Sequence, residues 1–194
     1  LRRSMQTVMY QVLVDLAKAL TPILPHTMEE IWSYLKEPED YVQLAEMPTV
    51  THFDNETQLL AQWQQFMAIR SDVLKALEEA RDNKVIGKSL EAKVTLYPTP
   101  DAKQLLANLD ANVQQILIVS DLEISTDPAP ADALQFDDVA VQVEHAPGEV
   151  CPRCRMTRTD VGVDPRFPLF DGRCAKIVAE HYPEPLPKVS RIRT

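Results

Sequence analysis

The first third of the chain has the hydrophobic period of α-helices. Apolar residues recur at spacings of three and four from about residue 3 to residue 20, which predicts one amphipathic helix. A second helix is predicted after Pro25, with Thr27 as its N-cap and Glu30 completing a capping box. A third is predicted from about Glu56 to Asp82. Because a single apolar stripe cannot bury itself, we expect these helices to pack on one another or on further helices.

The middle of the chain changes to the period of β-strands. Alternating apolar and polar residues predict strands over Ala92–Tyr97 and Val139–Val143, and a short strand over Leu122–Ile124. The apolar run at the end of Val113–Val119 predicts a buried strand, whereas Asp101–Leu109 has the spacing of a helix. Together these segments predict a small mixed α/β layer.

The composition excludes several classes of protein. Hydrophobic residues make up 45% and charged residues 25% of the 194 positions, an ordinary globular balance that argues against disorder. No apolar run approaches the roughly 20 residues of a membrane span, so we expect no membrane partner. Gly87-Lys88-Ser89 resembles the end of a phosphate-binding loop, but Asp82 occupies the place of the first glycine and a strand follows instead of a helix.

Charge is distributed unevenly along the chain. The net charge is −9, from 20 Lys and Arg against 29 Asp and Glu. From Cys151 onward nine basic residues face five acidic ones, a net of +4, so the first 150 residues carry −13. This asymmetry suggests a terminal part that meets a polyanion, and drift in composition is the competing explanation.

Three cysteines lie within 24 residues of one another and indicate a metal site. Cys151-Pro-Arg-Cys154 is a C-x-x-C pair, whose spacing lets a turn aim two thiolates at one ion, and Cys174 adds a third thiolate. An odd, clustered set without a signal peptide fits zinc in a reducing compartment better than a disulfide framework. We therefore predict one bound Zn²⁺ and a cytoplasmic location.

The sequence leaves the fourth zinc ligand open. A ribbon of four thiolates would need a cysteine at position 171, where this chain has Asp171. Aspartate binds zinc through oxygen, so a Cys₃Asp site is our first expectation, weaker and more acid-labile than a Cys₄ site. His145, His181 or water are alternative ligands. In a second interpretation the site has decayed and Asp171 is a solvated turn residue.

Basic residues crowd around the cysteines. A planar guanidinium binds phosphate and stacks on unpaired bases, which favours RNA contact at these positions. The candidate RNA-binding residues are Arg153, Arg155, Arg158, Arg173 and Lys176. In the competing interpretation the arginines only solvate a small domain and pair with Asp160, Asp164 and Asp171.

We therefore predict an α+β chain with three folded parts and a tail. The first residue is Leu1 rather than Met and lies inside a helical pattern, so we expect a piece of a longer protein. The expected parts are a partial helical bundle over residues 1–83, a mixed α/β junction domain over residues 84–147, a zinc-ribbon-like knuckle over residues 148–182 and an extended tail over residues 183–194.

Three stretches resemble the C-terminal portion of bacterial isoleucyl-tRNA synthetases. The helix–Pro–helix stretch over residues 2–32 resembles their anticodon-binding helical domain, a signature shared with valyl- and leucyl-type relatives. Ile86–Val94, with the sequence IGKSLEAKV, is more specific to isoleucyl enzymes, and residues 151–174 resemble their zinc ribbon. The resemblance covers nearly the entire chain, and residues 37–55 and 99–138 are its least distinctive parts.

The chain departs from this family at two positions. Asp171 stands where the family has a cysteine, which affects the fourth zinc ligand. Arg155 directly follows the second cysteine, where the family often has a tryptophan. A guanidinium plane would then take over the stacking on a base.

The resemblance implies a function for the parent protein. It implies a class I ligase that charges tRNA with isoleucine using ATP, with the catalytic and editing domains outside this sequence. The chain itself then has no catalytic residue and recognises the anticodon stem and loop. Its expected partners are isoleucine-acceptor tRNA and the rest of the synthetase, and we expect a monomer. The alternatives are a structural zinc-ribbon module that docks on the parent enzyme without touching RNA, and a free-standing zinc-ribbon protein that binds nucleic acid.

Overall fold

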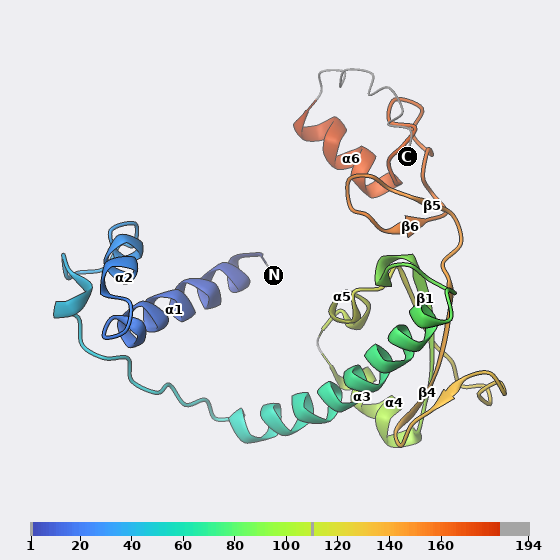
Figure 1. The fold of residues 1–194 in the computed structure, drawn as a ribbon, viewed down its shortest axis with the longest axis horizontal. Helices are drawn as coiled ribbons and strands as arrows, with labels where there is room; N and C mark the ends of the chain where they lie inside the picture. The colour runs from blue at the N-terminus through green and yellow to red at the C-terminus, as the bar shows by residue number, and fades with distance from the viewer. Residues whose placement is uncertain (1, 110, 183–194) are drawn as a thin grey trace. The chain divides into compact units, whose positions relative to one another are not determined.

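The computed structural model describes residues 2–109 and 111–182, and the chain divides into two compact units, residues 1–56 and residues 57–194. The predicted tail over residues 183–194 lies outside the described residues. Helices and strands are both present, which confirms the α+β class (Figure 1). Among the described residues no helix combines the length and the apolar character that crossing a membrane would require.

The first unit contains two α-helices and one 3-10 helix, which pack on one another. They are α1 (Arg2–Leu20), α2 (Pro25–Trp32) and η1 (Val42–Leu44). The expected N-cap at Thr27 is wrong, because α2 begins at Pro25 with Leu24 as its N-cap and no side-chain cap. Proline is well placed at a first helical position, where its missing N–H needs no partner.

The apolar stripe of α1 is largely exposed. The small core of this unit forms around Val14 and Ala17 of α1, with Met28 and Trp32 of α2 and Val42 of η1. On the remaining face of α1 seven large apolar side chains are between 39% and 67% exposed: Met5, Val8, Met9, Tyr10, Val12, Leu13 and Leu16. One short helix and one 3-10 turn are too small to cover a helix of 19 residues.

The second unit is built on a mixed sheet of four strands. Its strands are β1 (Ala92–Pro98), β2 (Asp121–Ile124), β3 (Leu134–Gln135) and β4 (Val139–His145), in the order β2-β1-β4-β3. Strand β1 pairs in parallel with β2 and antiparallel with β4, and β3 pairs antiparallel with β4. The three strands predicted from alternation are thereby confirmed, and β3 is an additional short one.

The long helix α3 (Glu56–Asp82) covers this sheet with one face (Figure 1). Phe66, Val73 and Leu77 of α3 are buried in one core with Val94 of β1 and Val141 of β4. Helix α4 (Pro100–Asn108) joins the same core, and Thr99 caps it by accepting a hydrogen bond from the Ala102 amide. The helix predicted over residues 101–109 is confirmed.

The buried strand predicted over Val113–Val119 is wrong. The structure has a short helix there, α5 (Val113–Leu117), which Asn112 caps by accepting a hydrogen bond from the Gln115 amide. Ile118 ends α5 in a left-handed conformation with φ of 59°. A short apolar run has no period that separates a strand from a buried helical turn, and here the cap at Asn112 decides for the helix.

The C-terminal part of the second unit is a hairpin followed by a helix. Strands β5 (Glu149–Val150) and β6 (Thr157–Arg158) pair antiparallel, and α6 spans Gly172–His181. Gly148 enters the hairpin with φ of 106°, and a Cβ there would lie 2.2 Å from the Arg158 carbonyl oxygen. Only glycine fits this close approach. The hairpin that it allows carries the C-x-x-C pair on the tight loop between β5 and β6.

Candidate metal centre

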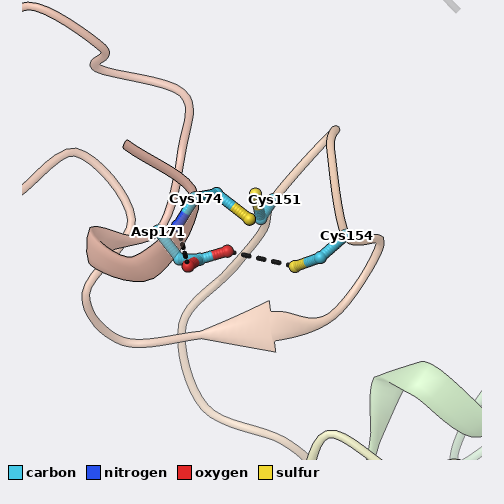
Figure 2. Close-up of side chains that lie close together, drawn as sticks. All are labelled: Cys151, Cys154, Asp171 and Cys174. Atoms are coloured by element: carbon cyan, nitrogen blue, oxygen red, sulfur yellow. Dashed lines mark hydrogen bonds between the residues drawn. The ribbon is translucent and has the colours of Figure 1, made fainter. Parts of the chain in front are cut away.

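The C-x-x-C loop closes through backbone hydrogen bonds. The Cys151 amide donates to the Met156 carbonyl at 3.0 Å, and the Arg155 amide donates to the Cys151 carbonyl at 2.8 Å. Arg155 has φ of 67°, a left-handed conformation that is unfavourable for a side chain other than glycine. This turn brings the Cys151 and Cys154 side chains to the same side of the loop (Figure 2).

Helix α6 contributes the other two members of the cluster. Asp171 is its N-cap, and its Oδ1 accepts a hydrogen bond from the Cys174 amide at 2.9 Å. Its Oδ2 accepts a hydrogen bond from the Cys154 thiol at 3.0 Å (Figure 2). The capping role of Asp171 was not predicted, although an Asp directly before a helical segment is a readable N-cap signal.

The four side chains fit a single ion. The sulfurs of Cys151, Cys154 and Cys174 and a carboxylate oxygen of Asp171 all lie within 4.8 Å of one another. In a zinc tetrahedron with bonds of about 2.3 Å, neighbouring ligand atoms lie roughly 3.7 Å apart, so a small contraction closes the cluster on the metal. Cys151, Cys174 and Asp171 are buried, which gives the charged ligands a dry setting. Thiolate and carboxylate donors in this geometry are suited to Zn²⁺.

Burial and hydrogen bonds shift the pKa values of the cluster in opposite directions. Burial raises the pKa of the Cys154 thiol to about 12, and its hydrogen bond to Asp171 acts in the same direction. Burial also acts to raise the pKa of Asp171, but hydrogen bonds from Cys151, Cys154 and the Cys174 amide outweigh it and hold that pKa well below its usual range. A coordinated thiol loses its proton outright, so metal binding releases protons from this cluster.

Comparison with known proteins shows which family the chain belongs to. The profile of the anticodon-binding domain of tRNA ligases matches residues 2–96, and the profile of the zinc finger found in FPG and IleRS matches residues 148–177. The isoleucine–tRNA ligases of Lactobacillus johnsonii and Enterococcus faecalis are 67% and 59% identical to the chain, each over 183 residues. That of Latilactobacillus sakei is 64% identical over 185 residues. The chain carries the anticodon-binding domain and the zinc finger of bacterial isoleucine–tRNA ligases.

The match to the isoleucine–tRNA ligases covers only part of these enzymes. The alignments include 94% of this chain and 20% of each relative. The chain therefore spans about a fifth of the ligases it matches and does not include their catalytic domains. The resemblance seen in the sequence is confirmed, and the zinc-finger match agrees with the cluster of three cysteines and one aspartate.

The two histidines considered as alternative fourth zinc ligands lie outside the cluster. His145 is at the end of β4, where its Nδ1 lies 2.9 Å from the Ala146 carbonyl oxygen, and His181 is at the end of α6. Neither belongs to the group of four among the described residues. We therefore keep Asp171 as the proposed fourth ligand, with the three cysteines.

The candidate RNA-binding residues of the finger occupy two different settings. Arg153 donates a hydrogen bond from Nη1 to the Cys174 sulfur at 3.5 Å, so it lies against the metal cluster. Arg155, Arg173 and Lys176 are exposed, and Arg158 is half-buried. Among the described residues none of the five forms an ion pair. Asp164 pairs instead with Arg166, and Asp160 accepts a hydrogen bond from the Gly172 amide.

A shallow hollow lies beside the cluster. It encloses about 340 Å³, and its lining includes Arg158, Arg173, Asp160 and Asp171. The aspartates are engaged in hydrogen bonds within the finger, whereas the guanidinium groups are free of ion pairs within residues 2–109 and 111–182. The finger therefore presents two guanidinium groups without direct ion-pair partners among the described residues, beside two carboxylates of the same hollow.

Proposed function

We propose that the chain recognises the anticodon stem and loop of isoleucine-acceptor tRNA, as part of an enzyme that attaches isoleucine to that tRNA using ATP. The observation that carries this proposal is the match of residues 2–96 to the anticodon-binding domain of tRNA ligases, together with relatives of 59 to 67% identity that bear the name isoleucine–tRNA ligase. The remainder of that enzyme is the proposed protein partner, and we propose a monomer in the cytoplasm.

The distribution of charge supports RNA contact through the zinc finger. The residues before Cys151 carry a net charge of −13, and this charge repels RNA nonspecifically, whereas the residues from Cys151 onward carry +4. Arg155, Arg173 and Lys176 are exposed and have no carboxylate partner among the described residues. Splayed loop bases and their phosphates are the parts of an anticodon that such side chains can reach.

Binding of tRNA at a series of salt concentrations tests this function. We expect the 194-residue chain to bind isoleucine-acceptor tRNA in preference to other tRNAs, with log affinity that falls linearly with log salt. Arg155→Ala and Arg173→Ala should each reduce the slope by about 0.7, the contribution of one phosphate contact on a single strand. Arg166→Ala is the matched control, because Arg166 lies in the same finger but is paired with Asp164. Equal affinity for all tRNAs would contradict the proposal.

A structural role for the finger is the second candidate. It is favoured by Arg153, which hydrogen-bonds to Cys174, and by Thr157, which is buried against the mixed domain. In this case the finger stabilises the ligase without touching RNA. Charge reversal of Arg153, Arg155 and Arg158 separates the two functions, because tRNA binding with an unchanged salt slope would favour the structural role.

A further inference from the structure

The segment Ile86–Val94, whose sequence is more specific to isoleucyl enzymes than the helix–Pro–helix stretch, forms a hydrogen-bonded loop and the beginning of a strand in the second unit. It contains the 3-10 helix η2 (Ser89–Glu91) and the beginning of β1. The Glu91 carboxylate holds the loop, since its Oε2 accepts hydrogen bonds from the Gly87 amide at 2.9 Å and the Lys88 amide at 3.1 Å. The backbone around Leu90 is therefore fixed before any contact with the zinc finger.

Two buried side chains join the zinc finger to this loop. Thr157, in β6, donates from its amide to Ser120 Oγ at 2.8 Å and from Oγ1 to the Leu90 carbonyl at 3.2 Å. Ser120 Oγ in turn donates to the same Leu90 carbonyl. Ser120 is fully buried and Thr157 is 3% exposed, so water does not compete for these hydrogen bonds.

Further contacts hold both sides of this junction. The Ser120 amide donates to the Ala92 carbonyl at 3.1 Å, which ties Ser120 to β1. The segment that leads into the finger is also bound, because the buried Ala146 donates from its amide to the Glu91 carbonyl at 2.7 Å. The finger thus contacts the loop through β6 while the incoming chain contacts it one residue further on.

We infer that Ser120 and Thr157 are positioning residues that lock the zinc finger in one orientation on the mixed domain, with the Leu90 carbonyl as their shared acceptor. The IGKSLEAKV segment, Ile86–Val94, is the part of the mixed domain on which the finger docks. Neither Ser120 nor Thr157 belongs to the group of four candidate metal ligands. If the finger contacts RNA as proposed above, this lock holds its arginines in place before binding and lowers the entropic cost of forming the complex.

Tumbling of the finger in solution tests the lock. ¹⁵N relaxation of the zinc-loaded 194-residue chain is expected to give the amides of residues 149–177 the same correlation time as the amides of β1 and β4. In Ser120→Ala the finger should acquire a shorter correlation time, and the Thr157 amide should exchange with solvent roughly tenfold to a hundredfold faster, since it loses its acceptor. A finger that tumbles independently in the unaltered chain would overturn the inference.

Three further variants keep the test specific. Ser125→Ala removes a hydroxyl just after β2 whose hydrogen bonds, among the described residues, are with nearby Asp127, and it should leave finger tumbling unchanged. Thr157→Val keeps the amide but loses the bond to Leu90, so amide exchange should rise severalfold, and Thr157→Ser should restore it. Zinc content should equal that of the unaltered chain in all variants. If neither Ser120→Ala nor Thr157→Val changes exchange or tumbling, the inference fails.

Binding of tRNA distinguishes this inference from the proposed function. Ser120→Ala should weaken tRNA binding about tenfold with an unchanged salt slope, because the phosphate contacts persist while their pre-arrangement is lost. A chain that binds no tRNA would contradict the proposed function and leave the relaxation result to decide the lock. A chain that binds tRNA equally well with a freely tumbling finger would contradict the lock alone.

Discussion

Asp171 makes two contacts through its two carboxylate oxygens. Oδ1 caps α6 at the Cys174 amide, and Oδ2 faces the Cys154 sulfur. A cysteine at this position would supply a stronger zinc ligand but is a poor N-cap. As the proposed fourth ligand, Asp171 would bind the metal less strongly than a cysteine but supplies a hydrogen bond that fixes the first turn of the helix bearing Cys174.

Substitutions at Asp171 should separate these two roles. Asp171→Ala should lower zinc affinity at least about tenfold, since it removes a ligand and not merely a supporting hydrogen bond, and should cost the helix about 1 kcal/mol through the lost cap. Asp171→Asn keeps the cap and should lose zinc affinity, whereas Asp171→Cys should raise it. Chelator competition measures zinc affinity, and the free energy of unfolding of the zinc-loaded chain measures the contribution of the cap. Unchanged zinc affinity in Asp171→Ala would remove Asp171 from the ligand set.

The loop around η2 depends on a single carboxylate for its shape. Glu91 bridges the Gly87 and Lys88 amides, and the hydrogen bond from Gly87 is the main reason that its pKa lies below the ordinary value of 4.5. A depressed carboxyl pKa contributes stability that is fully present above the unfolded value and is lost as pH falls through the folded value. The loop that receives the zinc finger should therefore loosen in acid.

Replacing Glu91 by Gln should remove this pH dependence. At pH 7 Glu91→Gln should be less stable than the unaltered chain, because a neutral amide accepts these hydrogen bonds more weakly than a carboxylate. The difference should shrink as pH falls below 4.5, where the carboxyl of the unaltered chain takes up a proton. Urea unfolding of both chains at several pH values measures it. A stability difference that stays constant from pH 7 to pH 3 would show that the charge on Glu91 plays no part.

The two ends of the second unit are stabilised by different means. The mixed domain has an extended apolar core under α3 and α4, and none of the core clusters among the described residues contains a side chain of residues 148–177. The buried residues of the finger include Cys151, Cys174 and Asp171, which are the proposed ligands themselves. We therefore expect a part of this size without an apolar core to gain its stability from a bound metal.

Removal of zinc should therefore unfold the finger and spare the sheet. On treatment with a strong chelator, amides of residues 149–177 should lose their protection from hydrogen exchange, while those of β1 and β4 keep theirs. Exchange measured by mass spectrometry resolves the two regions, and re-addition of Zn²⁺ should restore protection. Protection of the finger that survives chelation would show that the ion is dispensable for its fold.

Some features of the chain were determined by the sequence alone. The helices α1, α3 and α4 and the strands β1 and β4 were predictable, because hydrophobic period is a local property that the sequence carries directly. The approach of the Cys151 and Cys154 side chains was predictable for the same reason, since two intervening residues let one turn bring both to the same side. The likeness to isoleucine–tRNA ligases followed from such local signatures.

Other features were decided only by the tertiary structure. Val113–Leu117 is a helix that Asn112 caps, and its Leu117 is buried in the core that residues of α3 also form. The apolar stripe of α1 stays exposed because its own unit offers too little surface to cover it. Asp171 lies beside Cys154, from which it is 17 positions away, and Thr157 lies beside Ser120, 37 positions away. Contacts between distant segments depend on the path of the whole chain between them, and no local pattern records that path.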